Sequence, residues 1–230
     1  MDEGAGTAPL LGLSLASMTI DGLTFFNPWA EIAASGNRLP HWEQRGVPYF
    51  VTFHLADSIP RDLREQLAGE RAAWLKAHPK PWDAAEEREY LRRFSGAVER
   101  WLDAGHGACI LRTDAAAAVV AGALRHFDGG RYVQHAWVVM PNHVHAVFTL
   151  HREWPLATVL HSWKSFTAHE LVKSAAAAAP IWHEDYFDRL VRDAEHFENC
   201  VRYIRRNPAK AGLREGEFTH YEDDLAKSVK

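Results

Sequence analysis

The sequence lacks several features that mark whole classes of proteins. Only two of its 230 residues are cysteines, Cys109 and Cys200, and they form no CxxC pair. Two cysteines are too few for a disulfide scaffold, and their scarcity suits a reducing compartment. No apolar run approaches the about 20 residues that a membrane-spanning helix needs. We therefore expect a cytoplasmic protein without a membrane partner.

The chain also has no excess of positive charge. Lys and Arg number 26 against 30 Asp and Glu, which gives a formal net charge of −4. A site for a polyanion must therefore be local. Hydrophobic residues make up 47% of the chain and nine residues are Trp, so the composition excludes disorder and predicts a globular core.

Hydrophobic patterning predicts both strands and helices. The strands are expected at 48–55, 131–140, 143–150 and, as a strand or extended stretch, 181–191. The helices are expected as two within 61–107, joined at the prolines near residue 80, and then over 113–124, 155–177 and 194–206. This order is the split βαβ arrangement of an α+β, ferredoxin-like antiparallel sheet, and we expect its helices on one face.

Three regions follow from this pattern. We expect an N-terminal extension over 1–45, a domain over 46–213 with a helical insertion at about 61–107, and a C-terminal tail over 214–230. Acids and bases balance within the insertion, which is typical of a solvated helical hairpin.

Two histidines stand two residues apart in the third predicted strand. Side chains alternate along a strand, so His143 and His145 project from the same face, about 7 Å apart. Two imidazoles on one face are half of a metal site and need a further ligand. Taken alone, this pair favours the simpler interpretation of two histidines on a solvent-facing surface of the sheet.

The last predicted helix carries a second candidate pair. Tyr203 and Asn207 are four residues apart, so they lie one turn apart on one side of the helix. We expect this side to be opposite the apolar stripe and Pro208 to end the helix. A buried tyrosine with a hydrogen-bonded hydroxyl remains the alternative.

Positive charge gathers around this helix. Between Arg189 and Arg214 there are seven bases and three acids. A basic surface beside a tyrosine suits a phosphate backbone. Pairs such as Glu198 with Arg202 would explain part of it as an ordinary solvated helix face. The candidate DNA-binding residues on this stretch are Arg189, Arg192, Arg202, Arg205, Arg206 and Lys210.

Four motifs together resemble a known family. They are Pro141-Asn-His-Val-His145, Trp163-Lys-Ser-Phe-Thr-Ala168, the segment from Trp182 to Asp193, and Tyr203-Ile-Arg-Arg-Asn-Pro-Ala-Lys-Ala-Gly-Leu213. In this order they resemble the REP-associated tyrosine transposases, which are single-tyrosine HUH transposases of small bacterial insertion sequences. The resemblance runs from about Val47 to Leu213, and the insertion is less typical of the family.

The resemblance implies a role for each candidate residue. His143, His145 and Asn207 match the positions that bind a divalent metal, and Tyr203 matches the nucleophile. Mg²⁺ or Mn²⁺ suits these neutral ligands, and Lys164 joins the DNA-binding residues. The implied enzyme is a DNA transposase that cuts single-stranded DNA beside a hairpin, keeps the 5′ end as a phosphotyrosine, and rejoins strands.

The resemblance also implies a DNA partner, a location and an oligomeric state, and two alternative functions stay open. The DNA partner would be of the repetitive extragenic palindrome type, and the protein would be nucleoid-associated and either a monomer or a homodimer. The main alternative is a domesticated transposase that binds DNA hairpins as a regulator without cutting. An RNA-processing nuclease with a metal-activated water is a more distant one.

Overall fold

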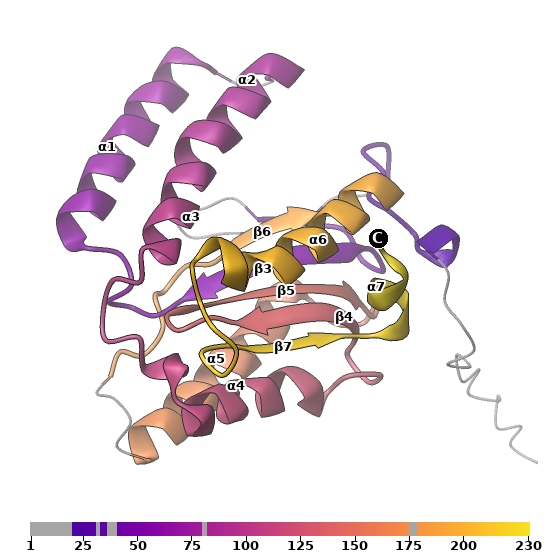
Figure 1. The fold of residues 1–230 in the computed structure, drawn as a ribbon. Coiled ribbons are helices and arrows are strands. Elements are labelled where there is room, and N and C mark those ends of the chain that lie inside the picture. Colours follow the sequence, from indigo (N-terminus) through magenta and orange to yellow (C-terminus); the bar gives the residue numbers. More distant parts are fainter. Residues whose placement is uncertain (1–19, 31–32, 36–40, 80–81, 175–178) are drawn as a thin grey trace, which may run out of the picture.

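A five-stranded antiparallel sheet forms the centre of the molecule (Figure 1). The computed structural model describes residues 20–30, 33–35, 41–79, 82–174 and 179–230. The strand order is β6-β3-β5-β4-β7. The strands are β3 (Pro48–His54), β4 (Tyr132–Val139), β5 (His143–Leu150), β6 (Phe187–Leu190) and β7 (Thr219–Glu222). The first four stand in the predicted split βαβ order, so the predicted fold class is confirmed.

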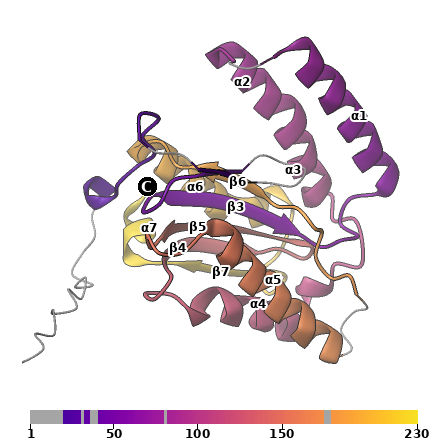
Figure 2. The ribbon, with the colours of Figure 1, turned by 180° about the vertical axis from the view of Figure 1, so that it is seen from behind.

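Helices cover both faces of this sheet (Figures 1 and 2). α4 and α5 pack on one face, and α6 and α7 pack on the other. The prediction that the helices lie on one face of the sheet is wrong, because α6 packs on the face opposite α4 and α5. α6 follows the last strand of the split βαβ unit, so the crossover that holds the other two helices on their face does not constrain it. The bounds are α4 (Asp114–His126), α5 (Leu156–Lys173), α6 (Ala194–Lys210) and α7 (Asp224–Ser228).

Alternation along the central strands separates two cores. In β3, Tyr49, Val51 and Phe53 point toward α4 and α5, whereas Phe50 points toward α6. Val144 of β5 belongs to the first core. Because both faces are buried, the two strands read as nearly continuous apolar runs with a few polar residues. Those polar residues all face α6.

The insertion forms two helical rods beside the sheet (Figure 1). Its elements are α1 (Arg61–Ala77), α2 (Ala84–Tyr90), the π-helical turn η2 (Leu91–Ser95) and α3 (Gly96–Asp103). The predicted break falls between α1 and α2, with residues 80–81 outside the described part. Val98 and Leu102 of α3 pack with Ile59 and with Phe187 of β6. α3 therefore lies against the sheet at the edge strand.

Several smaller elements complete the described chain. A two-stranded sheet joins β1 (Ala33–Ser35) to β2 (His41–Glu43) within the predicted N-terminal extension. Two short turns of 3₁₀ helix are η1 (Ile20–Gly22) and η3 (Ile110–Arg112). The expectation of a loose N-terminal tail over residues 1–19 lies outside the described residues. Across the described ranges, no helix has both the length and the apolar character that crossing a membrane requires.

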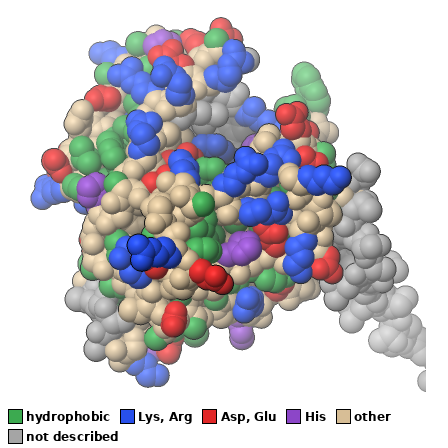
Figure 3. Space-filling view, in the orientation of Figure 1, with side chains coloured by type: hydrophobic (Ala, Val, Ile, Leu, Met, Phe, Trp, Pro, Cys, Tyr) green, Lys and Arg blue, Asp and Glu red, His purple; other side chains and the backbone are tan. Residues whose placement is uncertain are grey.

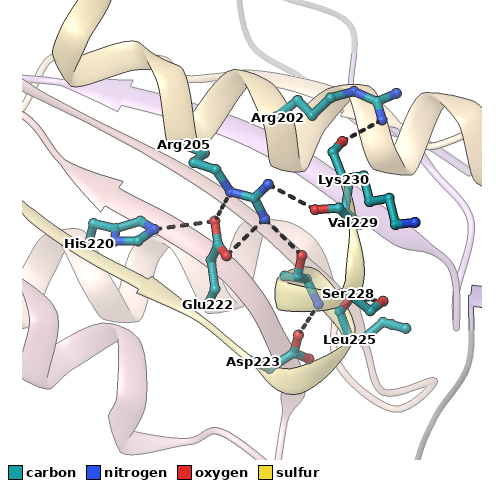
Figure 4. A network of polar contacts seen from close by, with 10 residues as sticks. Arg202, Arg205, His220, Glu222, Asp223, Leu225, Ser228, Val229 and Lys230 are labelled. Atoms are coloured by element: carbon teal, nitrogen blue, oxygen red, sulfur yellow. Dashed lines mark hydrogen bonds and ion pairs between the residues drawn. The ribbon is translucent and has the colours of Figure 1, made fainter.

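The C-terminal segment is part of the fold, although the sequence predicted only a tail. β7 pairs with β4 and adds the fifth strand. Arg205 of α6 ties this segment down (Figure 4). Its guanidinium donates to both carboxylate oxygens of Glu222 and to the carbonyl oxygens of Ala226 and Val229. Four of its five N–H groups are thereby used.

We predict that Arg205→Ala loosens this segment. Glu222 is only 8% exposed in its side chain, and the change leaves the ring of His220 as the remaining side-chain partner of its carboxylate. We expect a loss of about 1–3 kcal/mol in the free energy of unfolding, measured by urea denaturation. Arg206→Ala, at the exposed neighbouring position, is the control. Equal losses in both variants would contradict the assignment.

Candidate functional site

Two strands bring four polar side chains together beneath α6. His143 and His145 project from β5, and the register of β3 places His54 opposite His143 and Thr52 opposite His145. All four are buried. The alternation predicted for the histidine pair is therefore present, but their surface is covered and does not face solvent.

Asn142 determines the orientation of the first histidine. Its Nδ2 donates to the carbonyl oxygens of Leu102 (3.2 Å) and His106 (3.1 Å). Its Oδ1 is then the acceptor for His143 Nδ1, at 2.7 Å. His143 therefore carries its proton on Nδ1, and its Nε2 presents a lone pair. That Nε2 is buried and has no hydrogen-bond partner.

The second histidine is held in the same tautomer. His145 Nε2 lies 3.4 Å from Asn207 Nδ2, which donates to it, and His145 Nδ1 lies 2.7 Å from Thr52 Oγ1. Burial lowers the pKa of His145 to about 3 and that of His143 well below its ordinary value. Both imidazoles are therefore neutral at neutral pH.

α6 brings the tyrosine and the asparagine to the histidines. The Tyr203 ring meets His145 edge-on, with 5.1 Å between centroids, and meets Phe50 in the same way at 5.7 Å. Tyr203 is half-buried against the α6-side core, and Asn207 is buried. The prediction that Tyr203 stands opposite the apolar stripe is wrong, because α6 lies flat on the sheet and buries a broad face.

Pro208 does not end the helix as predicted. α6 continues to Lys210, and Gly212, with a φ of +70°, closes it as Leu213 N donates to the carbonyl of Pro208. Proline in a last turn removes only one helical hydrogen bond, and the closing turn supplies others. The extra turn brings Lys210 onto the Tyr203 side of the helix.

The donor set fits a divalent cation. Asn207 Oδ1 is buried without a partner, like His143 Nε2. Two imidazole lone pairs and an amide oxygen are neutral ligands that leave coordination positions open, as Mg²⁺ or Mn²⁺ needs. Among the described residues no group of three His, Cys, Asp or Glu is arranged to hold a metal, so Asn207 would be the third ligand of such a site.

The hydroxyl of Tyr203 is the third orphaned atom. Tyr203 Oη is buried and has no hydrogen-bond partner. Burial raises the pKa of Tyr203, and the charges of Glu99 and Asp103 raise it further. The phenol is therefore held protonated in the structure as it stands.

Some of the predicted DNA-binding residues share one surface. Arg189 lies on β6, with its guanidinium 3.8 Å from Glu99, and Lys210 bonds Asp103 at 2.8 Å. Arg192 and Arg206 are exposed. Lys and Arg side chains gather over α6 in the space-filling view (Figure 3). This group flanks Tyr203.

Three other predicted residues are engaged elsewhere. Arg205 holds the C-terminal segment, and Arg202 donates to the carbonyl of Lys230 (Figure 4). Arg202 also donates to Glu198 and Asn199. Lys164 lies on α5, where it donates to the carbonyl of Glu184. α5 covers the opposite face of the sheet, so the structure does not bring Lys164 to the α6 surface.

Sequence reasoning missed four contributors to the site. Asn142 directly precedes the first histidine, so its place beside the pair was readable from the motif. Thr52 sits in a predicted strand, but only the register shows that it meets His145. Asp103 and Glu99 belong to the insertion, and no local signal indicates that α3 reaches Tyr203.

The fold and the site define a class of proteins. A split βαβ sheet presents two histidines on a central strand to a tyrosine and an asparagine one helical turn apart. The family model described as "Transposase IS200 like" matches residues 130–207, a range that contains all four of these residues.

Two individual proteins are similar to this chain. The chain is 26% identical over 98 residues to the REP-associated tyrosine transposase of Escherichia coli (strain K12), covering 41% of this chain and 57% of that relative. The solved structure of a REP-associated tyrosine transposase bound to a REP hairpin covers 75% of this chain and 72% of its own, with 17% identity and a TM-score of 0.39. The predicted resemblance to this family is confirmed by the family model and the curated relative.

His54 makes the stability of this region pH-dependent. It is 2% exposed, and burial lowers its pKa from 6.5 to about 3. The unfolded chain takes up this proton near pH 6.5 and the folded chain only near pH 3, so acid favours unfolding. The stability that depends on neutral His54 is complete above pH 6.5 and is lost as the pH falls toward 3.

We predict a shallower acid dependence for His54→Gln. Over this range its free energy of unfolding should fall less steeply than that of the parent, by up to about 1.4 kcal/mol per pH unit. Denaturation series between pH 7 and pH 4 measure this, with the exposed His106→Gln as control. Parallel curves for His54→Gln and the parent would refute it.

Proposed function

We propose that this protein is a DNA transposase that cuts and rejoins single-stranded DNA through Tyr203. The observation that carries the proposal is the convergence of three buried polar atoms that lack partners: His143 Nε2, Asn207 Oδ1 and Tyr203 Oη. Buried polar groups are normally satisfied, and exceptions gathered at one point are typical of a site that awaits a ligand. Membership of all four site residues in the matched range supports the same assignment.

His143, His145 and Asn207 would hold Mg²⁺ or Mn²⁺. Such an ion, when bound, withdraws charge from the phosphodiester and so assists attack by a weak phenol nucleophile. Asn142 holds His143, and Thr52 together with Asn207 holds His145, in the tautomer with an unprotonated Nε2. Such supporting hydrogen bonds are typical of metal-ligating histidines.

The protein's own side chains orient the nucleophile. Phe50 and His145 pack edge-on against the ring of Tyr203 and restrict its position. Oη attacks the phosphorus, the bond to the 3′ oxygen breaks, and the 5′ end stays on the tyrosine. The covalent link retains the energy of the phosphodiester, so the free 3′ hydroxyl can reverse the reaction without ATP.

The substrate would be single-stranded DNA next to a hairpin of the repetitive extragenic palindrome type. Support comes from the name of the E. coli relative and from the exposed bases near Tyr203. Arg189, Arg192, Arg206 and Lys210 are the residues we propose for the phosphate backbone. Such a protein would work at the nucleoid, as a monomer or a homodimer.

Tyr203→Phe should abolish the covalent adduct while leaving the fold intact. Oη has no partner, so its loss should change the free energy of unfolding by no more than about 0.5 kcal/mol. With a labelled hairpin that carries a single-stranded flank, and with Mg²⁺ or Mn²⁺, adduct formation should fall about 10³-fold or more. Hairpin affinity should match the parent.

Two other tyrosines serve as controls. Tyr186 and Tyr221 pack against the core on the opposite face of the sheet, so Tyr221→Phe should cut normally. Mapping a DNA-linked peptide to either of them would overturn the nucleophile assignment. Hairpin binding by the parent without any adduct would favour the non-catalytic regulator, and cutting without an adduct would favour a nuclease that uses water.

His143→Ala should remove the effect of the metal. In the parent, Mn²⁺ should raise the melting temperature, because a ligand of the folded state stabilises it. We expect this rise to disappear in His143→Ala and His145→Ala and to persist in the exposed His169→Ala. Both site variants, like EDTA, should lose cleavage and keep hairpin binding, and Asn207→Ala should be milder. A normal Mn²⁺ response in His143→Ala would show that the ion binds elsewhere.

A further inference from the structure

The insertion places a carboxylate beside the proposed nucleophile. Asp103, the last residue of α3, bonds Lys210 Nζ through Oδ2 at 2.8 Å. The same Nζ lies 5.6 Å from the centre of the Tyr203 ring. Lys210 Nζ therefore lies close both to the carboxylate and to the tyrosine ring.

Both groups have an atom without a partner. Asp103 Oδ1 and Tyr203 Oη are both buried and make no hydrogen bond. A carboxylate oxygen is an acceptor and a phenol hydroxyl is a donor, so these two groups are complementary hydrogen-bond partners. Hydrogen bonds of catalytic groups often form only when the substrate is bound. Asp103 Oδ1 and Tyr203 Oη would form theirs when DNA binds.

Asp103 is not placed to serve the histidine pair. In the part of the chain that the structure describes, no three His, Cys, Asp or Glu side chains are arranged around a common metal position. Its neighbour one turn earlier, Glu99, faces Arg189, and no Glu99 oxygen is among the buried atoms without a partner. Asp103 is therefore the carboxylate with an oxygen free for Tyr203.

We propose that Asp103 accepts the proton of Tyr203 when the strand is cut and returns it when strands are rejoined. The proposal rests on the proposed function of Tyr203. The Oη–H bond breaks and the proton passes to Asp103 Oδ1, while Oη forms a bond to phosphorus. The bond from phosphorus to the 3′ oxygen breaks, and that oxygen leaves with the electron pair and takes a proton from water. In rejoining, the 3′ hydroxyl gives its proton to water as its oxygen bonds to phosphorus, the bond from phosphorus to Oη breaks, and the protonated carboxyl gives its proton to the departing Oη.

Lys210 has a defined part in this arrangement. It holds Asp103 Oδ2, which leaves Oδ1 as the free oxygen of the carboxylate. Its positive charge also offsets the repulsion between the carboxylate and an incoming phosphate. The insertion would thus supply a catalytic group to a site built on the sheet.

Chemical rescue tests the proposal. Asp103→Ala should slow adduct formation on the labelled hairpin about 10²–10⁴-fold, the usual size of a general-base contribution. Added acetate should enter the space that the side chain leaves and restore the rate at least about tenfold, whereas chloride at equal ionic strength should not. Asp103→Asn, which keeps the shape of the side chain, should be equally slow in cutting and in rejoining.

Glu65→Ala in α1 is the control, because it removes the same charge from an exposed position of the same insertion. Its rate should stay within about tenfold of the parent and should not respond to acetate. Hairpin binding at the parent's affinity shows that a variant is folded. If Asp103→Ala does not bind the hairpin, the cutting rate of Asp103→Asn tests the proposal instead.

Three results would overturn the proposal: cutting by Asp103→Asn within about threefold of the parent, no acetate response in a folded Asp103→Ala, or the same loss and rescue in Glu65→Ala. If the parent itself formed no adduct, the failure would lie with the role of Tyr203.

Discussion

The side-chain amide of Asn142 is the contact on which the site depends. It joins the end of the insertion, through the carbonyls of Leu102 and His106, to the first histidine of β5. Its own backbone carbonyl accepts from Leu55 N, just past the end of β3. One residue therefore fixes the hairpin, the neighbouring strand and the tautomer of His143. An amide suits this position because it donates on one side and accepts on the other.

The central strands and most helices could be predicted because their sequences are strongly periodic. β3, β4 and β5 are rich in β-branched and aromatic residues, and α4 and α6 repeat apolar residues at helical spacing. β7 could not be predicted in this way, since its sequence Thr219–Glu222 is short and polar. It is held by backbone pairing with β4 and by the bidentate contact between Arg205 and Glu222. Both are long-range contacts that local patterning does not encode.

The candidate site was predictable to the extent that it follows local geometry. Strand alternation places His143 and His145 on one face, and helical spacing joins Tyr203 to Asn207. The meeting of the two pairs depends on how α6 crosses the sheet, and that angle is set by packing against Phe50 and Val147. The same packing explains why Tyr203 is half-buried. A helical wheel drawn for α6 alone puts Tyr203 on the solvent side of the helix. The local excess of positive charge likewise predicted that Arg205 binds DNA. In the structure its guanidinium is instead bonded to Glu222 and to the backbone of the C-terminal segment.

Charge is balanced at the site even though the exposed side of α6 is basic. Glu99 and Asp103 of α3 stand opposite Arg189 and Lys210, so the bases nearest Tyr203 are paired while Arg192 and Arg206 are exposed to solvent. Unpaired cations packed this closely would repel one another and the folded state would be less stable. The acids of the insertion relieve that repulsion without neutralising the exposed surface. A chain with a net charge of −4 presents a basic surface over α6 in this way. Its acids Glu99 and Asp103 lie beside the bases Arg189 and Lys210, which would otherwise repel one another.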